Sequence, residues 1–422
     1  MHLTRMLSRL ACASLLCALL GTPAGAALAA EPAGPPVEVT AIVEAADGRL
    51  SFVTQRAASR RSGTDLARRL DARPDVVAAS LEQPVYAVGS PDPLRSQQWG
   101  LTRLAAEQVW AGGTATGQVV AVLDTGVDAA HPDLAGIVAP GLDVVTATGT
   151  ATIDPHGHGT HVAGVVAAIG ENGFGGAGLG QGVRVLPVRV LDQSGAGTDG
   201  DVARGMVWAV DNGATVLNLS LGGPNPSSLL TSAVEYALAR DVVVIAAAGN
   251  AGANGDPVLY PAATRGVIAV GAVRSDDTRP TWSSTGSHLS LAAPGVGIMS
   301  TVPGGGHASW SGTSMAAPFV AAAAALVRAG EPSLAPAQLR SRLMATARDL
   351  GAPGLDSQYG AGLVDVLAAR AAGLPAGAPS DDTSDQPVAE PVSEPVAPAP
   401  APVAPAPAPV APAPAPVAPA PV

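Results

Sequence analysis

Three short segments, far apart in the chain, carry side chains that together could attack a carbonyl carbon. Segment 312–318 (GTSMAAP) places Ser314 among small residues at the start of an apolar, alanine-rich stretch, where its hydroxyl stays accessible. Segment 158–164 (HGTHVAG) begins with His158, and segment 119–126 (VVAVLDTG) carries Asp124 after a run of apolar residues. A serine hydroxyl needs a base to take its proton, histidine has a pKa of about 6.5, and a buried aspartate can orient the imidazole. The sequence therefore predicts these three residues as a triad for nucleophilic catalysis.

Strands and helices that alternate along the chain must position these side chains. Continuous Val, Ile and Leu runs indicate strands at 118–123, 183–190, 214–219, 241–247 and 266–272. Helical stretches are predicted near 158–168, 199–211, 227–240, 314–328 and 336–347. Such runs favour a parallel sheet covered on both faces, in which ligands bind beyond the carboxyl ends of the strands. Asp124 and Asn250 both fall just past strand ends, where a site is expected.

The order Asp124, His158, Ser314 along the chain is the order found in subtilisin. With these segments and the segment 246–250 (AAAGN), the chain resembles the subtilisin-like serine proteases, a family of secreted subtilases, over roughly residues 92–373. The resemblance implies an α/β, three-layer fold with a mostly parallel sheet flanked by helices. It also implies a serine endopeptidase that hydrolyses peptide bonds through an acyl-enzyme, with Asn250 donating to the oxyanion beside the backbone N–H of Ser314.

Two other functions are compatible with part of this pattern. A catalytically silent module could keep the fold and bind peptides, but the intact triad and Asn250 argue against it. An esterase of the α/β-hydrolase type needs a Gly-x-Ser-x-Gly motif, and segment 312–316 lacks the second glycine.

The resemblance also implies a channel in which a protein or peptide substrate binds as an added strand. The residues assigned to its two edges are Ser220, Leu221 and Gly222 on one side and Gly195, Ala196 and Gly197 on the other. Leu259 is placed at the primary specificity pocket. Because no acidic residue stands out there, an apolar substrate side chain is expected.

No catalytic cofactor is expected, but the resemblance implies a structural Ca²⁺ held by Asp92, Asp133 and Asn172. Oxygen ligands from separated loops suit this ion, although the loop at 173–176 is richer in glycine than is usual in the family and one residue is inserted. His156 and His161 do not predict zinc, since no cysteine or aspartate completes a ligand set. His161 is expected to pack beside the catalytic residues.

Composition excludes several other classes of protein. The chain has 422 residues, 47% of them hydrophobic, and all 23 basic residues are arginine. The absence of lysine excludes a Ser–Lys dyad, a Schiff-base lysine and a P-loop lysine. A net charge of −11 without a basic cluster argues against nucleic-acid binding. The protein is expected to be a monomer.

Residues 1–30 resemble a secretory signal peptide, too short in its apolar part for a transmembrane span, and they contain both cysteines, Cys12 and Cys17. Residues 31–89 are expected to form a small α+β propeptide that assists folding and inhibits the enzyme, with a strand at 37–43, a helix at 64–70 and an extended stretch at 76–88. The peptidase domain is expected at 90–375.

Residues 376–422 form an acidic and then Pro/Ala/Val-rich tail of low complexity, expected to be disordered. Either a spacer that associates a secreted enzyme with the cell envelope or an inert tail fits this composition.

Overall fold

The computed structural model describes residues 37–82, 92–147 and 149–372. The chain forms two compact units that divide between Gly89 and Ser90. The predicted signal peptide with Cys12 and Cys17, and the predicted tail at 376–422, lie outside the described residues. Each unit is described by itself below.

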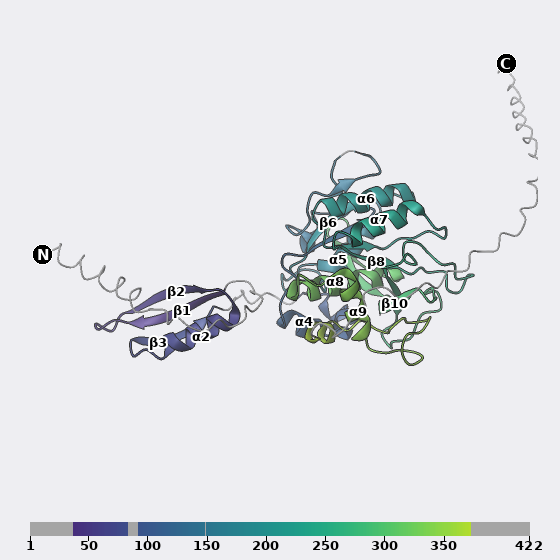
Figure 1. The fold of residues 1–422 in the computed structure, drawn as a ribbon. Coiled ribbons are helices and arrows are strands. Elements are labelled where there is room, and N and C mark those ends of the chain that lie inside the picture. The colour runs from purple at the N-terminus through teal and green to yellow at the C-terminus, as the bar shows by residue number, and fades with distance from the viewer. Residues whose placement is uncertain (1–36, 83–91, 148, 373–422) are drawn as a thin grey trace, which may run out of the picture. The chain divides into compact units, whose positions relative to one another are not determined.

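The smaller unit is a three-stranded antiparallel sheet with one helix (Figure 1). Its elements are β1 (Val37–Glu44), β2 (Leu50–Ala57), α2 (Arg60–Asp71) and β3 (Val76–Leu81), with the strand order β2-β1-β3. One face of the sheet packs Val39 and Ala41 against the helix. On the other face Ile42 lies opposite Phe52, whose surface is 70% exposed. β2 was not predicted, because five of its eight residues are exposed and its polar and apolar residues do not alternate clearly.

The larger unit is built on a seven-stranded sheet in which every described strand pair is parallel. The strands are β4 (Val119–Asp124), β5 (Leu142–Asp143), β6 (Arg184–Arg189), β7 (Val216–Leu219), β8 (Val243–Ala247), β9 (Ile268–Val273) and β10 (Leu289–Pro294), in the order β10-β9-β8-β7-β4-β6-β5. A separate antiparallel hairpin is formed by β11 (Ile298–Val302) and β12 (Gly306–Trp310). The predicted parallel sheet is confirmed, and its five predicted strands all occur.

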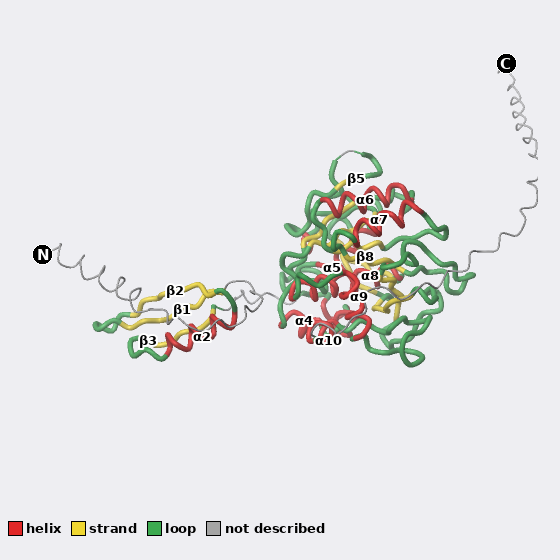
Figure 2. The backbone as a smooth tube through the Cα atoms, viewed as in Figure 1, coloured by secondary structure: helices red, strands yellow, loops and turns green. Residues whose placement is uncertain are grey.

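Helices cover both faces of this sheet, which gives the predicted three layers (Figure 1); Figure 2 shows the strands between the helices. The helices are α3 (Trp99–Arg103), α4 (Ala106–Ala111), α5 (His158–Ala167), α6 (Asp199–Asp211), α7 (Ser228–Leu238), α8 (Thr313–Gly330), α9 (Pro336–Ala345) and α10 (Val366–Ala371), and short 3₁₀ turns lie at Arg95–Gln97 and Pro132–Leu134. α6 and α7 pack on one face, whereas α5 and α8 pack on the other. Of the helices on that second face, α5 begins at His158 and α8 begins one residue before Ser314, which are two of the predicted catalytic residues.

Helix α8 forms the centre of the larger core. Its run of five alanines, 321–325, is completely buried, and these small side chains let the helix lie close to β7, β8 and β9. Within the described residues α8 is the one helix whose length and apolar character would suffice to cross a membrane, but 83% of it is buried inside the unit. It is therefore the core helix of a globular domain.

Candidate active site

Asp124 ends strand β4 and is completely buried. Its two carboxylate oxygens lie 2.8 and 2.9 Å from Nδ1 of His158, the first residue of α5. The backbone N–H of Thr125 donates to the same carboxylate at 2.8 Å. This arrangement fixes the tautomer of the imidazole, because Nδ1 must carry the proton that Asp124 accepts, and it leaves Nε2 free to act as a base.

A second buried carboxylate, Asp154, shapes the turn that enters α5. It accepts the backbone N–H groups of His156, Gly157 and Thr160 at 2.7–3.1 Å and the hydroxyls of Thr125 and Thr160 at 2.7–2.8 Å. The sequence analysis missed this residue, since an Asp-Pro pair by itself indicates only a turn. The signal that could have found it is its position four residues before the histidine.

Two charges compete with burial at His158. Burial by itself lowers the pKa of this imidazole, but the negative charges of Asp124 and Asp154 and the hydrogen bond to Asp124 outweigh it, so the pKa is raised above the usual histidine value. The imidazolium that forms when the histidine takes a proton is therefore stabilised by the site.

Ser314 lies in the first turn of α8, in a hollow that it shares with His158 and Asn250. Its hydroxyl donates to the backbone carbonyl of Ser220 at 3.1 Å, and the Ser220 hydroxyl donates to the carbonyl of Ser314 at 2.8 Å. For attack on a substrate, the Ser314 hydroxyl must rotate from this carbonyl toward Nε2 of His158. Catalytic hydrogen bonds of this kind commonly tighten only when the substrate is bound.

Asn250 follows strand β8 and is held by its side-chain oxygen. This oxygen accepts the backbone N–H of Thr313 at 2.9 Å and the Thr313 hydroxyl at 3.0 Å. With the oxygen turned toward the start of α8, the amide N–H₂ group of Asn250 faces the hollow that contains Ser314. That group can donate to an oxyanion, as the sequence analysis predicts.

His161 lies under the site and packs, as the sequence analysis expects. Its ring stacks on Trp310 with centroids 4.7 Å apart and planes 2° apart, and its Nε2 lies 3.0 and 3.1 Å from the carbonyls of Ile298 and Ala308. Burial lowers its pKa to about 4, so the ring is neutral near pH 7. Trp310 also stacks on His158 with centroids 6.3 Å apart, a neighbour that the sequence analysis did not identify.

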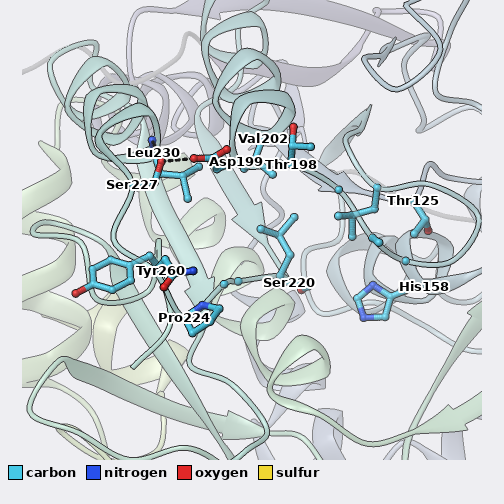
Figure 3. Close-up of a pocket in the computed structure, with 18 of the residues that line it drawn as sticks. Thr125, His158, Thr198, Asp199, Val202, Ser220, Pro224, Ser227, Leu230 and Tyr260 are labelled. Carbon is cyan, nitrogen blue, oxygen red and sulfur yellow. Dashed lines mark hydrogen bonds between the residues drawn. The ribbon is translucent and has the colours of Figure 1, made fainter. Parts of the chain in front are cut away.

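All six residues predicted for the channel edges line one hollow of about 730 Å³, which also borders His158 and Thr125 (Figure 3). One edge is held in place because Gly223 and Tyr260 exchange backbone hydrogen bonds of 3.0 and 2.8 Å. Leu259 lies beside this edge, since a side chain at Gly222 would come within 3.3 Å of its Cβ. The residues predicted for the two edges of the substrate channel thus share one hollow.

The three residues predicted to bind calcium lie close together, but donor groups already surround their oxygens. Asp92 accepts the backbone N–H groups of segment 171–173 at 2.8–3.1 Å. Asp133 accepts the amide of Asn172 at 2.9 Å and Nε2 of His307 at 2.9 Å. N–H donors that point at a carboxylate have the wrong polarity for a shared cation, so this arrangement does not fit Ca²⁺ unless His307 and the Asn172 amide turn away.

Comparison with known proteins places residues 115–362 in the family described as the subtilase family. The chain is 44% identical over 275 residues to subtilisin DY of Bacillus licheniformis, which covers 64% of this chain and 97% of the relative. It is 44% identical over 276 residues to subtilisin Savinase of Lederbergia lenta, covering 65% of this chain and 99% of the relative. Among solved structures, a protease of Pseudoalteromonas arctica matches with a TM-score of 0.61 and 33% identity, over 68% of this chain and 99% of the other.

The two histidines of the site should titrate far apart. We expect the pKa of His158, measured by NMR titration of histidine-labelled Ser314→Ala protein, to lie above the ordinary value of about 6.5. His161 should remain neutral down to a pH of about 4. Replacing Asp154 by Asn removes one of the negative charges and should lower the His158 midpoint. A wild-type midpoint at or below the ordinary value would contradict this account.

Proposed function

The chain belongs to the subtilase family, and we propose that this serine endopeptidase works through Asp124, His158 and Ser314. The observation that carries the proposal is the carboxylate–imidazole pair, with distances of 2.8 and 2.9 Å, at the rim of a hollow that also holds the serine. The imidazole accepts the proton of the Ser314 hydroxyl as that oxygen attacks the peptide carbonyl. Asp124 stabilises the imidazolium that results.

The negative charge that develops on the carbonyl oxygen needs fixed donors. The side-chain amide of Asn250 and the backbone N–H of Ser314 lie at one hollow and can both donate to this oxygen. His158 then gives its proton to the leaving amine, which departs and leaves an acyl-enzyme. Water, activated by the same imidazole, hydrolyses the ester and frees Ser314.

We further propose that the enzyme is secreted and made as a precursor that removes its own propeptide, residues 31–89. The smaller unit supports this proposal, because its sheet presents Phe52, Leu50 and Ile42 on the face opposite its helix, and the first two are more than half exposed. A sheet face of this kind suits docking on a second surface. The role of the tail at 376–422, as a spacer to the cell envelope or as an inert segment, stays a prediction.

The first test replaces the nucleophile. Ser314→Ala should reduce turnover of unfolded casein by about 10⁶-fold, the order seen when a subtilisin loses its serine. The same variant should accumulate in a protease-free host as a precursor that retains residues 31–89, detected by intact mass and N-terminal sequencing. Wild-type protein should react with a fluorophosphonate probe, whereas the variant should not.

Three results would count against these proposals separately. Equal labelling of the two proteins by the probe would exclude Ser314 as the nucleophile. Normal maturation of the variant would reject self-processing, but it would not contradict the proposed peptidase activity of the wild-type protein. Wild-type protein that never cleaves casein after verified removal of residues 31–89 would favour a silent peptide-binding module.

The second test concerns the oxyanion. Asn250→Asp retains an oxygen that can accept from Thr313 but removes the amide donor, so kcat should fall by about 10²–10³-fold with little change in KM. Asn250→Ala, which also removes the contact with Thr313, should lose both kcat and melting temperature. Steady-state kinetics and thermal unfolding of the two variants separate the catalytic loss from the structural one. An unchanged kcat in both would exclude the oxyanion role.

Calcium at Asp92, Asp133 and Asn172 remains a proposal that rests on the resemblance. It predicts that a chelator lowers the melting temperature of the mature protein and that added Ca²⁺ restores it. Identical melting with chelator and with excess calcium would refute it. His307→Ala serves as a matched variant, because it removes the imidazole from an oxygen of Asp133 and leaves only the longer hydrogen bond from the N–H of Gly176 at 3.2 Å among the described contacts of that oxygen, so any response to calcium should strengthen.

A further inference from the structure

The large hollow extends from the catalytic residues to a second group of residues at its far end. Thr125 and His158 border one end, whereas Ser227 and Leu230 lie at the other (Figure 3). Val202 and Leu230 are buried and form an apolar part of the wall. The far end is therefore a pocket separate from the site of bond cleavage but continuous with it.

One carboxylate, Asp199, stands beside this apolar wall (Figure 3). It is the first residue of α6, and its Oδ2 accepts the hydroxyl of Ser227 at 2.6 Å while its Oδ1 accepts the N–H of Gly200 at 2.8 Å. Both donors are neutral. They hold the carboxylate in one orientation without cancelling its charge.

The charge of Asp199 has no positive neighbour in the wall of the hollow. Among the described residues that line it, Asp199 is the one carboxylate and no arginine is present. Arg204, one turn further along α6, forms an ion pair with Asp201, which does not line the hollow. A concave surface with one sign of charge and apolar walls attracts the opposite charge.

We propose that the far end of this hollow binds an arginine or lysine side chain of the substrate, on the acyl side of the scissile bond. The aliphatic stem packs over Val202 and Leu230, and the cationic head reaches Asp199. This inference rests on the peptidase function proposed above and names the substrate class of the same site.

The position of the side chain follows from the site. The leaving amine must lie where His158 can donate a proton to it. This position is next to the hollow that contains Ser314, whose wall also includes Ser309, Trp310 and Met315. The edge at 220–223 therefore receives the acyl part of the peptide, whose alternate side chains point to the same face of the strand. Because Asp199 lies beyond this edge, the recognised residue precedes the one whose carbonyl is attacked.

The experiment measures kcat/KM for internally quenched peptides. In these peptides the residue whose carbonyl is attacked is apolar. Each of the four positions that precede this residue carries in turn Arg, Lys, Met or Glu. At one position we expect Arg and Lys to exceed Met by about twofold to fivefold and Glu to be disfavoured, in the range of an exposed ion pair, because Asp199 is exposed. The ratio should shrink at 1 M salt, because screening weakens an exposed pair.

Two isosteric variants locate the preference. Asp199→Asn keeps an oxygen for Ser227 but removes the charge, so the ratio of Arg to Met should fall to about one. Asp211→Asn removes one negative charge from the far end of the same helix, outside the hollow and without releasing Arg204 from Asp201, and it should retain the wild-type ratio. Thermal unfolding of both variants checks that the fold persists.

Three outcomes would overturn the inference. These are equal cleavage of Arg, Met and Glu peptides at all four positions, a preference that survives Asp199→Asn, or the same loss in Asp211→Asn. If the proposed function is wrong, wild-type protein will cleave none of the peptides, including those that carry Met. This result differs from all three outcomes above.

Discussion

The site depends on a negative charge that is completely removed from water at the end of strand β4. Burying an unpaired carboxylate costs on the order of several kcal/mol, so the fold must supply donors at that point. Asp124 obtains them from the imidazole of His158 and the N–H of Thr125. The hydrogen bond that orients the imidazole is thus also what makes the buried carboxylate tolerable.

This pairing constrains the backbone around it. Helix α5 must start beside the end of β4, and a Cβ at Gly159 would lie 2.1 Å from the carbonyl oxygen of Gly126. Any side chain at that position would push the histidine away from Asp124. Gly159 is therefore required by the close approach of the two segments, whereas Gly126 is required by its positive φ of 111° and by the carbonyl of Ile153, which a Cβ would meet at 2.2 Å. Asp154 fixes the same junction from the other side through five hydrogen bonds.

The sequence predicts the central elements well because their burial is uniform. Strands β4, β6, β7, β8 and β9 are continuous apolar runs, and each predicted helix occurs within a few residues of its expected range. Strand β10 (LSLAAP) mixes serine with small residues, and the β11–β12 hairpin contains Ser, Thr and His, so neither shows a clear period. Trp310 and Asp199 could not be identified from the sequence, because their importance arises from neighbours that only folding brings together.

Proximity in space is only one of the conditions for a calcium site. Asp92, Asp133 and Asn172 do meet in space, yet His307, from a hairpin that the sequence analysis did not predict, lies on the carboxylate of Asp133. The proposed Ca²⁺ would therefore have to displace this imidazole, which lies 2.9 Å from Asp133.

The proposed substrate channel must obtain its selectivity from side chains. Glycine-rich edges bind the peptide through its backbone, which is the same for every sequence, so discrimination must come from the few side chains that reach the pockets. Asp199 is placed at the start of α6, where the partial positive charge of the helix end stabilises a carboxylate. Ser227 and the N–H of Gly200 already hold the carboxylate in one orientation, so little reorganisation is needed when a cation enters. An acidic side chain would meet a fixed negative charge there, so this single residue both attracts one class of peptide and rejects another.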